Sequence, residues 1–163
     1  MSDTQKKQTQ ITALRLLAAS PKSKKELKDK LLSKGYPEEV VEEVLEALEK
    51  QGVLSDAQYA QNLASRYVYG KPSGRKRIEF ELKRHGVGSK IREDVLTSLS
   101  VEDEKGRARD LGLSQWDKLK KIEPIKRKKR VYDFLLRRGF EYSIVQEIVS
   151  ALEKMNGDDL NEC

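Results

Sequence analysis

The chain contains few of the residues that build common enzyme sites. Its 163 residues include one cysteine and one histidine. Cys163 is the last residue, so we expect no intrachain disulfide, and the final residues do not match a prenylation box. His85 alone cannot supply an ordinary zinc site or a histidine-based catalytic triad. We therefore expect a protein that is not an enzyme and that uses no metal and no cofactor.

Long apolar runs are also missing. The first ten residues are polar and lack the apolar core of a secretory signal, and no run approaches the roughly 20 apolar residues that a membrane span needs. We expect a soluble, cytoplasmic protein without membrane contact. Hydrophobic and charged residues each make up 37% of the chain, which is too little apolar material for one deep core. Several thin helical clusters suit this composition better.

One apolar pattern occurs three times. Counted from Gly35, Gly86 and Gly139, apolar residues stand at −8, −4, +5, +9, +10 and +13 in every copy, with no insertion. The glycines lie 51 and 53 residues apart, which is close to the length of three short helices with their turns. We read each glycine as a helix stop in the left-handed conformation, and therefore as a determinant of the fold.

The predicted fold is all-α, with three tandem three-helix repeats forming an elongated, curved array. We assign residues 1–52 to the first repeat, 53–99 to the second, 100–155 to the third and 156–163 to a flexible tail. Such an array offers an extended surface, which favours binding over catalysis.

Local signals set the expected helix bounds. The first helix should cover about residues 9–19, and the second should begin after a Ser23–Glu26 capping box. Asp56 is the expected cap of the fourth helix, which should end near Gly70. In the third repeat Gly112 is a candidate break, and the last helix should cover about residues 143–155.

Positive charge concentrates in the second and third repeats, although the net charge is only +6. Bases gather at the start of the middle helix and again before its glycine. One such cluster is most often a solvated helix face, but two at equivalent repeat positions predict a positive track for a phosphate backbone. The predicted nucleic-acid-binding or filament-binding residues are Arg75, Lys76, Arg77, Arg84, Lys126, Arg127, Lys128, Lys129, Arg130, Arg137 and Arg138.

Other features carry weaker functional readings. Six glutamates between residues 38 and 49 form either a solubilising face, which we favour, or a docking face for a basic partner. Tyr67, Tyr69, Tyr132 and Phe134 are able to stack on bases, but for most of them core packing is the favoured interpretation. The stretch from Gly70 to Lys76 lacks the residue order of a phosphate-binding loop. His85, just before its glycine, is expected to help cap helix carbonyls.

An ordered set of short motifs resembles the RecX family of bacterial regulatory proteins. The motifs are Ser23-x-x-Glu26-Leu27 through Gly35-Tyr36, Gly52-Val53-Leu54-Ser55-Asp56-x-x-Tyr59-Ala60, Arg77-Ile78 through Gly86-Val87, and Phe134-Leu135-x-x-Arg138-Gly139-Phe140. The resemblance covers about residues 11–153. Ser55 departs from it, because the family often has a second aspartate there, and this affects only a helix cap.

The resemblance implies a specific function. Proteins of this family consist of three-helix repeats, bind the helical groove of the RecA filament on DNA, and mostly inhibit its growth. They thereby lower the filament's ATP hydrolysis, its strand exchange and its co-protease activity in the SOS response. These activities belong to DNA repair and homologous recombination. The implied partners are the RecA filament and single- and double-stranded DNA, and we expect a monomer.

Two other function classes stay open at the level of sequence. The chain also fits a stand-alone helical DNA-binding protein or transcription regulator, although no helix stands out as a base reader. An enzyme acting on nucleic acid is disfavoured, because clustered histidine, cysteine or metal-binding carboxylates are missing.

Overall fold

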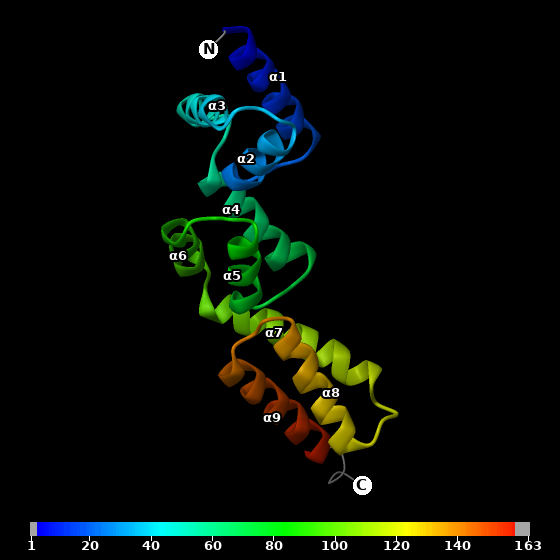
Figure 1. Ribbon diagram of the computed structural model, residues 1–163. Helices are drawn as coiled ribbons and strands as arrows, with labels where there is room; N and C mark the ends of the chain where they lie inside the picture. Colours follow the sequence, from blue (N-terminus) through cyan, green and yellow to red (C-terminus); the bar gives the residue numbers. More distant parts are fainter. Residues whose placement is uncertain (1–2, 159–163) are drawn as a thin grey trace. The chain divides into compact units, whose positions relative to one another are not determined.

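The protein is helical throughout the part that its computed structural model describes, residues 3–158 (Figure 1). This part contains nine α-helices, one short π-helical segment (η1) and no strand. The elements are α1 (Asp3–Ala19), α2 (Lys24–Ser33), α3 (Glu38–Lys50), α4 (Asp56–Ser65), η1 (Arg66–Gly70), α5 (Arg75–Arg84), α6 (Ser89–Ser98), α7 (Val101–Lys118), α8 (Pro124–Arg137) and α9 (Tyr142–Asp158). The predicted all-α class of nine helices is confirmed.

The chain forms two compact units. The first takes in the described residues up to Leu63 together with Glu81–Glu93, and the second takes in Ala64–Phe80 and the described residues from Asp94 onward. Each unit therefore holds one complete three-helix repeat and part of the second repeat.

The core of the first unit lies between α1, α2 and α3, which pack on one another in pairs. Its fully buried side chains include Leu27 and Leu31 from α2 and Leu45 and Leu48 from α3. These are positions of the repeated apolar pattern, spaced so that they share one helix face. Ala13 brings α1 against them.

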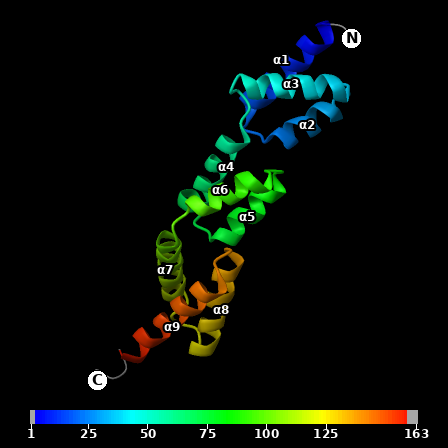
Figure 2. The same cartoon turned by 90° about the vertical axis from the view of Figure 1, so that its left-hand side faces the viewer.

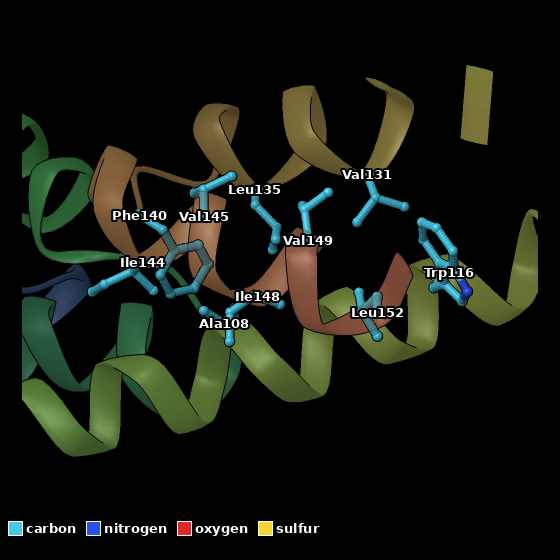
Figure 3. Close-up of a cluster of buried hydrophobic side chains, with 10 residues drawn as sticks. All are labelled: Ala108, Trp116, Val131, Leu135, Phe140, Ile144, Val145, Ile148, Val149 and Leu152. Carbon is cyan, nitrogen blue, oxygen red and sulfur yellow. The ribbon is translucent and has the colours of Figure 1, made fainter. Parts of the chain in front are cut away.

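The core of the second unit lies between α7, α8 and α9. Figures 1 and 2 both draw α8 and α9 side by side, and α7 packs against both. Phe140 and Trp116 lie at opposite ends of the buried cluster, with Leu135, Val149 and Leu152 between them (Figure 3). All six apolar pattern positions are buried in the first and third copies. In the second copy three are only half-buried: Ile91, Leu96 and Leu99.

The repeat glycines end helices as predicted. Gly35, Gly86 and Gly139 have φ of 89°, 77° and 81°, and no other residue type in the described chain has positive φ. This left-handed conformation costs a side chain about 1–2 kcal/mol, so glycine is the residue that fits.

Several predicted boundaries were wrong. Helix α1 begins at Asp3, because its polar first turns carry no apolar period that would mark them. Helix α7 continues through Gly112, whose missing side chain lets Ile148 approach to 3.0 Å from the position of a Cβ. Helix α9 extends to Asp158, so residues 156–158 of the predicted tail are helical, and the rest of the tail lies outside the described residues.

A joint links the first repeat to the second inside the first unit. The start of α2 meets residues that follow α3 and α5. The backbone N–H of Lys24 donates to the Asp56 carboxylate at 2.8 Å, and the Ser23 hydroxyl donates to the carbonyl of His85 at 2.5 Å. The prediction that Asp56 caps α4 was wrong, because its carboxylate accepts from the start of α2. The Ser55 hydroxyl accepts from the α4 backbone instead. The His85 ring contacts the Glu26 carboxylate rather than capping carbonyls.

The same joint recurs inside the second unit, between the second and third repeats. The backbone N–H of Arg75, which occupies the repeat position of Lys24, donates to Glu104 at 2.8 Å. The N–H of Gly74 donates to the carbonyl of Arg138 at 2.8 Å, and that of Lys76 donates to Gly139 at 3.1 Å. In each joint an acidic side chain accepts from a backbone N–H at a helix start, and a carbonyl at or just before a helix-ending glycine accepts a further hydrogen bond.

We expect alanine at Gly139 to be far more damaging than alanine at Gly35. A Cβ on Gly139 would lie 2.4 Å from the Arg77 Cβ, whereas one on Gly35 meets nothing within 4 Å. Gly35→Ala should cost about 1–2 kcal/mol of unfolding free energy from backbone strain alone. Gly139→Ala should cost at least about 1 kcal/mol more from overpacking. Urea unfolding followed by circular dichroism measures both, and equal losses would contradict the tight contact.

The first joint should weaken in acid. Burial alone would raise the pKa of Glu26, but hydrogen bonds from His85 and the Ser23 N–H outweigh it, so this pKa lies below its ordinary value of 4.5. The stabilisation is therefore present above about pH 4.5 and is lost as the pH falls through the lowered pKa. In thermal unfolding from neutral pH into acid, the difference in stability between Glu26→Gln and the wild type should shrink. For the exposed control Glu39→Gln, the difference in stability from the wild type should stay constant with pH. A difference for Glu26→Gln that does not shrink would refute the role of the Glu26 carboxylate in this joint.

Candidate nucleic-acid interface

The predicted binding residues occupy different environments, and Arg127 is the clearest correction. Its side chain is buried, with 8% of its surface exposed. The guanidinium donates to the carbonyl of Trp116 at 2.9 and 2.6 Å and lies 4.1 Å from the centre of the Trp116 ring. Arg127 therefore closes one end of the third repeat's core, and we withdraw it from the binding set.

Two further arginines pair with buried carboxylates. Arg75 is mostly covered, pairs with the buried Glu104 and donates to the carbonyl of Leu99 at 2.8 Å. Arg84, in the first unit, donates to the buried carboxylate of Glu81 at 2.7 Å. A buried carboxylate without a cationic partner lowers the stability of the fold. Both arginines therefore stabilise the structure, whatever else they contact.

A cationic groove lies in the second unit, beside the hydrogen bonds that join the start of α5 to the end of α8. Figures 1 and 2 show where these two helices lie in the ribbon. It encloses about 310 Å³. The described residues that line it include four cations, two aromatic rings, one serine and no acid: Tyr67, Lys71, Ser73, Arg77, Phe134, Arg137 and Arg138. The second and third repeats both contribute, so the structure brings three predicted binding residues, Arg77, Arg137 and Arg138, into one site.

The walls of this groove are held by main-chain contacts. The N–H of Ser73 donates to the carbonyl of Tyr67 at 2.8 Å, and the Ser73 hydroxyl donates to that of Lys71 at 2.7 Å. A Cβ on Gly74 would lie 2.3 Å from the carbonyl oxygen of Gly139, so the two segments touch backbone to backbone. The groove is therefore formed before any ligand arrives.

The guanidinium of Arg138 has a defined position. It lies 5.3 Å from the centre of the Phe134 ring and donates to the carbonyl of Pro72 at 3.4 Å. Arg77 lies similarly over the Phe80 ring, at 5.6 Å. Planar cations stacked on rings keep their in-plane donors directed outward, which suits phosphate oxygens.

A line of cations, which we call the α8 track, leads away from the groove. Lys126, Arg130 and Arg137 recur at a spacing that places them, with Phe134, on one face of α8. Lys126 and Arg137 are separated by roughly 16 Å at 1.5 Å per residue, a length that spans several phosphates of a DNA strand, whose axial rise in B-DNA is about 3.4 Å per phosphate. The track thus matches a strand length rather than a single ion.

The remaining predicted bases lie on the surface. Lys76 pairs with Glu141 at 3.1 Å, Lys128 with Glu153 at 2.7 Å, and Lys129 is exposed. Exposed ion pairs contribute little to stability, so a phosphate is able to replace the carboxylate at small cost. We keep these three lysines as peripheral binding residues.

The acidic helix of the first unit is partly neutralised by its own neighbours. Glu42 and Glu38 contact Lys28, Glu49 lies 2.5 Å from Lys24, and Glu43 lies 3.0 Å from Lys6. The contacts with Glu42 and Glu38 raise the pKa of Lys28. These pairs support the interpretation of α3 as a solubilising face.

Four of the lining residues were not in the predicted binding set: Ser73 and three charged or aromatic residues. The three are Lys71, Tyr67 and Phe134. Sequence analysis named the two rings as able to stack on bases but favoured core packing for most of the aromatic residues that it considered, and Lys71 was marked only by its nearness to Ser73–Gly74. The hydrogen bonds that join the start of α5 to the end of α8 bring the three together.

Within residues 3–158 no group of histidine, cysteine or acidic residues is placed to hold a metal. Nor does any helix of that range have the length and apolar character to cross a membrane.

Two single substitutions should separate structure from binding. Arg127→Leu should lower the free energy of unfolding by about 2 kcal/mol, because buried charged hydrogen bonds are lost. It should leave the salt dependence of DNA binding unchanged. Arg130→Gln should leave the free energy of unfolding unchanged. It should reduce the slope of log affinity against log salt by about 0.7 for a single strand. Urea unfolding and salt titrations measure these effects, and a reduced slope for Arg127→Leu would restore that residue to the interface.

Comparison with known proteins follows the three repeats. The RecX models match this chain in order: first three-helix domain at residues 12–48, second at 55–96 and third at 102–149. Regulatory protein RecX of Chlorobium limicola is 33% identical over 152 residues, which cover 93% of this chain and 94% of the relative. Its namesake in Pelodictyon phaeoclathratiforme is 33% identical over 163 residues, the full length of both chains.

A solved structure shows the same fold. The crystal structure of RecX from Lactobacillus salivarius superposes with a TM-score of 0.84 at 22% identity, covering 93% of this chain and 99% of that one. The relatives carry the name of regulatory proteins, which agrees with the predicted regulatory role. With all three domains matched in order and relatives aligned over nearly their whole length, this chain belongs to the RecX family of regulatory proteins.

Proposed function

We propose that this chain binds the filament that the RecA recombinase forms on DNA, along its helical groove, and mostly inhibits it. Family membership over the whole chain is the observation that carries the proposal. Filament growth, ATP hydrolysis, strand exchange and co-protease activity are the steps that it restrains. The protein works without catalysis, as a monomer in the cytoplasm.

The repeat architecture supports this mode of action. Each repeat is a three-helix unit with the same apolar pattern, and a filament offers identical protomers at regular intervals. Several weak contacts in one molecule reinforce one another through effective concentration. Bridged protomers resist the rearrangement that accompanies nucleotide turnover, which lowers hydrolysis.

The charge distribution supports contact with DNA in the same complex. The cationic groove and the α8 track belong to the second and third repeats, whereas α3 of the first unit carries paired glutamates. Cations on the second and third repeats suit phosphates. DNA binding strengthens the complex but does not replace the filament as the target.

Purified protein should slow ATP hydrolysis when added to RecA, single-stranded DNA and ATP, at amounts well below the RecA concentration. The decline should deepen with time, because restrained growth no longer compensates for loss of protomers. Arg130→Gln with Arg137→Gln should require several-fold more protein for the same inhibition, since two phosphate contacts are removed.

The matched control is Lys120→Gln with Lys121→Gln, which removes the same charge from exposed positions outside the groove and track. It should inhibit like the wild type. Unchanged hydrolysis at equimolar wild-type protein, together with ordinary DNA binding, would favour the stand-alone DNA-binding alternative.

A further inference from the structure

We propose that the cationic groove is a stacking subsite for one unpaired base of a single-stranded nucleic acid, whose backbone runs along the α8 track. This deepens the proposed function, on whose DNA contact it rests, by naming the form of nucleic acid and the way in which it is held. The residues that carry it are Tyr67, Lys71, Arg77, Phe134, Arg137 and Arg138.

The first step is the pairing of aromatic rings with cations. Tyr67 reaches the groove from η1 and Phe134 from α8, and both are half-buried, so each ring is anchored and still partly accessible. Phe134 packs against the third repeat's core while Arg138 covers part of its ring. Aromatic rings and guanidinium planes are the surfaces on which unstacked bases bind, with little dependence on base identity.

The second step is charge. Four cations surround the rings, and the described lining residues include no carboxylate. A nucleotide carries its phosphate next to its base, so it satisfies rings and cations together. An acidic peptide would satisfy the cations and leave the rings exposed to water. The mixture of rings and cations therefore favours a nucleotide over an acidic peptide.

The third step is shape. A volume of about 310 Å³ lies at the lower end of the range of small-ligand sites and suits one base with its sugar, not a helix. Bases of a duplex are stacked inside it and reach such a hollow only after extrusion, which costs free energy. The subsite therefore discriminates in favour of single strands, while the α8 track alone serves both forms.

The fourth step is preorganisation. The groove depends on the second joint, where Gly74 and Gly139 touch backbone to backbone. The unusual π-helical turn of η1 places Tyr67 at the groove and Tyr69, which is 83% exposed, in the lining of a different hollow. Two tyrosines two residues apart thus supply a test residue and its control.

The experiment measures affinity without RecA, using full-length protein and fluorescent oligothymidylate, the matching duplex and an abasic strand of the same length. For the wild type, oligothymidylate should bind about tenfold more tightly than the abasic strand, because only the former has bases to stack. This comparison needs no substitution, so it stands even if a variant misfolds.

Variants then locate the effect. Tyr67→Leu with Phe134→Leu, which keeps an apolar side chain at both positions and every charge, should lower oligothymidylate affinity about tenfold and change duplex affinity less than twofold. Tyr69→Leu should behave as the wild type. Circular dichroism and Trp116 fluorescence establish that each variant is folded.

Three results would overturn the subsite: equal wild-type affinity for the abasic strand and oligothymidylate, equal losses for single strand and duplex in the double variant, or displacement by polyglutamate as effective as by oligothymidylate. Inhibition of RecA hydrolysis by the same wild-type preparation would then show that the regulatory function stands without it. Base-dependent binding with no effect on RecA would instead refute the regulatory function and leave the subsite.

Discussion

The structure depends on how the second helix begins in the first two repeats. Donors at the start of α2 and α5 are satisfied from the next repeat, by an aspartate or glutamate side chain and by the residues around a helix-ending glycine. Each unpaired donor at a covered helix start would cost about 1–3 kcal/mol, so this arrangement fixes which repeat meets which, and in which register. The side chains of each core then pack between helices whose starting points are already fixed.

The cationic groove is a by-product of this constraint. Because the start of α5 must lie against the end of α8, bases distant in sequence become neighbours around Tyr67 and Phe134. Neither repeat contains the site by itself. Functional surface is thus created at the joint, where backbone geometry is most strictly determined, and this is why a loop with two glycines and a serine can hold its shape.

The sequence predicted what is repeated and missed what differs between copies. Glycine positions, apolar faces and the Ser23–Glu26 capping box follow from local chemistry that acts within a few residues, and all are found in the structure. The partners of Asp56, Glu104 and Arg127 lie in other helices, so no local rule could identify them. The charge count likewise located the basic segments but could not separate buried Arg127 from exposed Arg130, since that difference is made by Trp116.

Arg127 occupies the repeat position held by Ser23 and Gly74 in the earlier copies, where each of those residues bonds to the following repeat. In the third copy the guanidinium takes up that position and turns back to Trp116 of its own repeat. The position that bonds to the following repeat in the first two copies is therefore occupied by a large side chain in the third. A designer who wished to lengthen it would insert a new repeat between the second and third copies, keeping both joints, because an addition after the third would first have to replace Arg127 with a small residue.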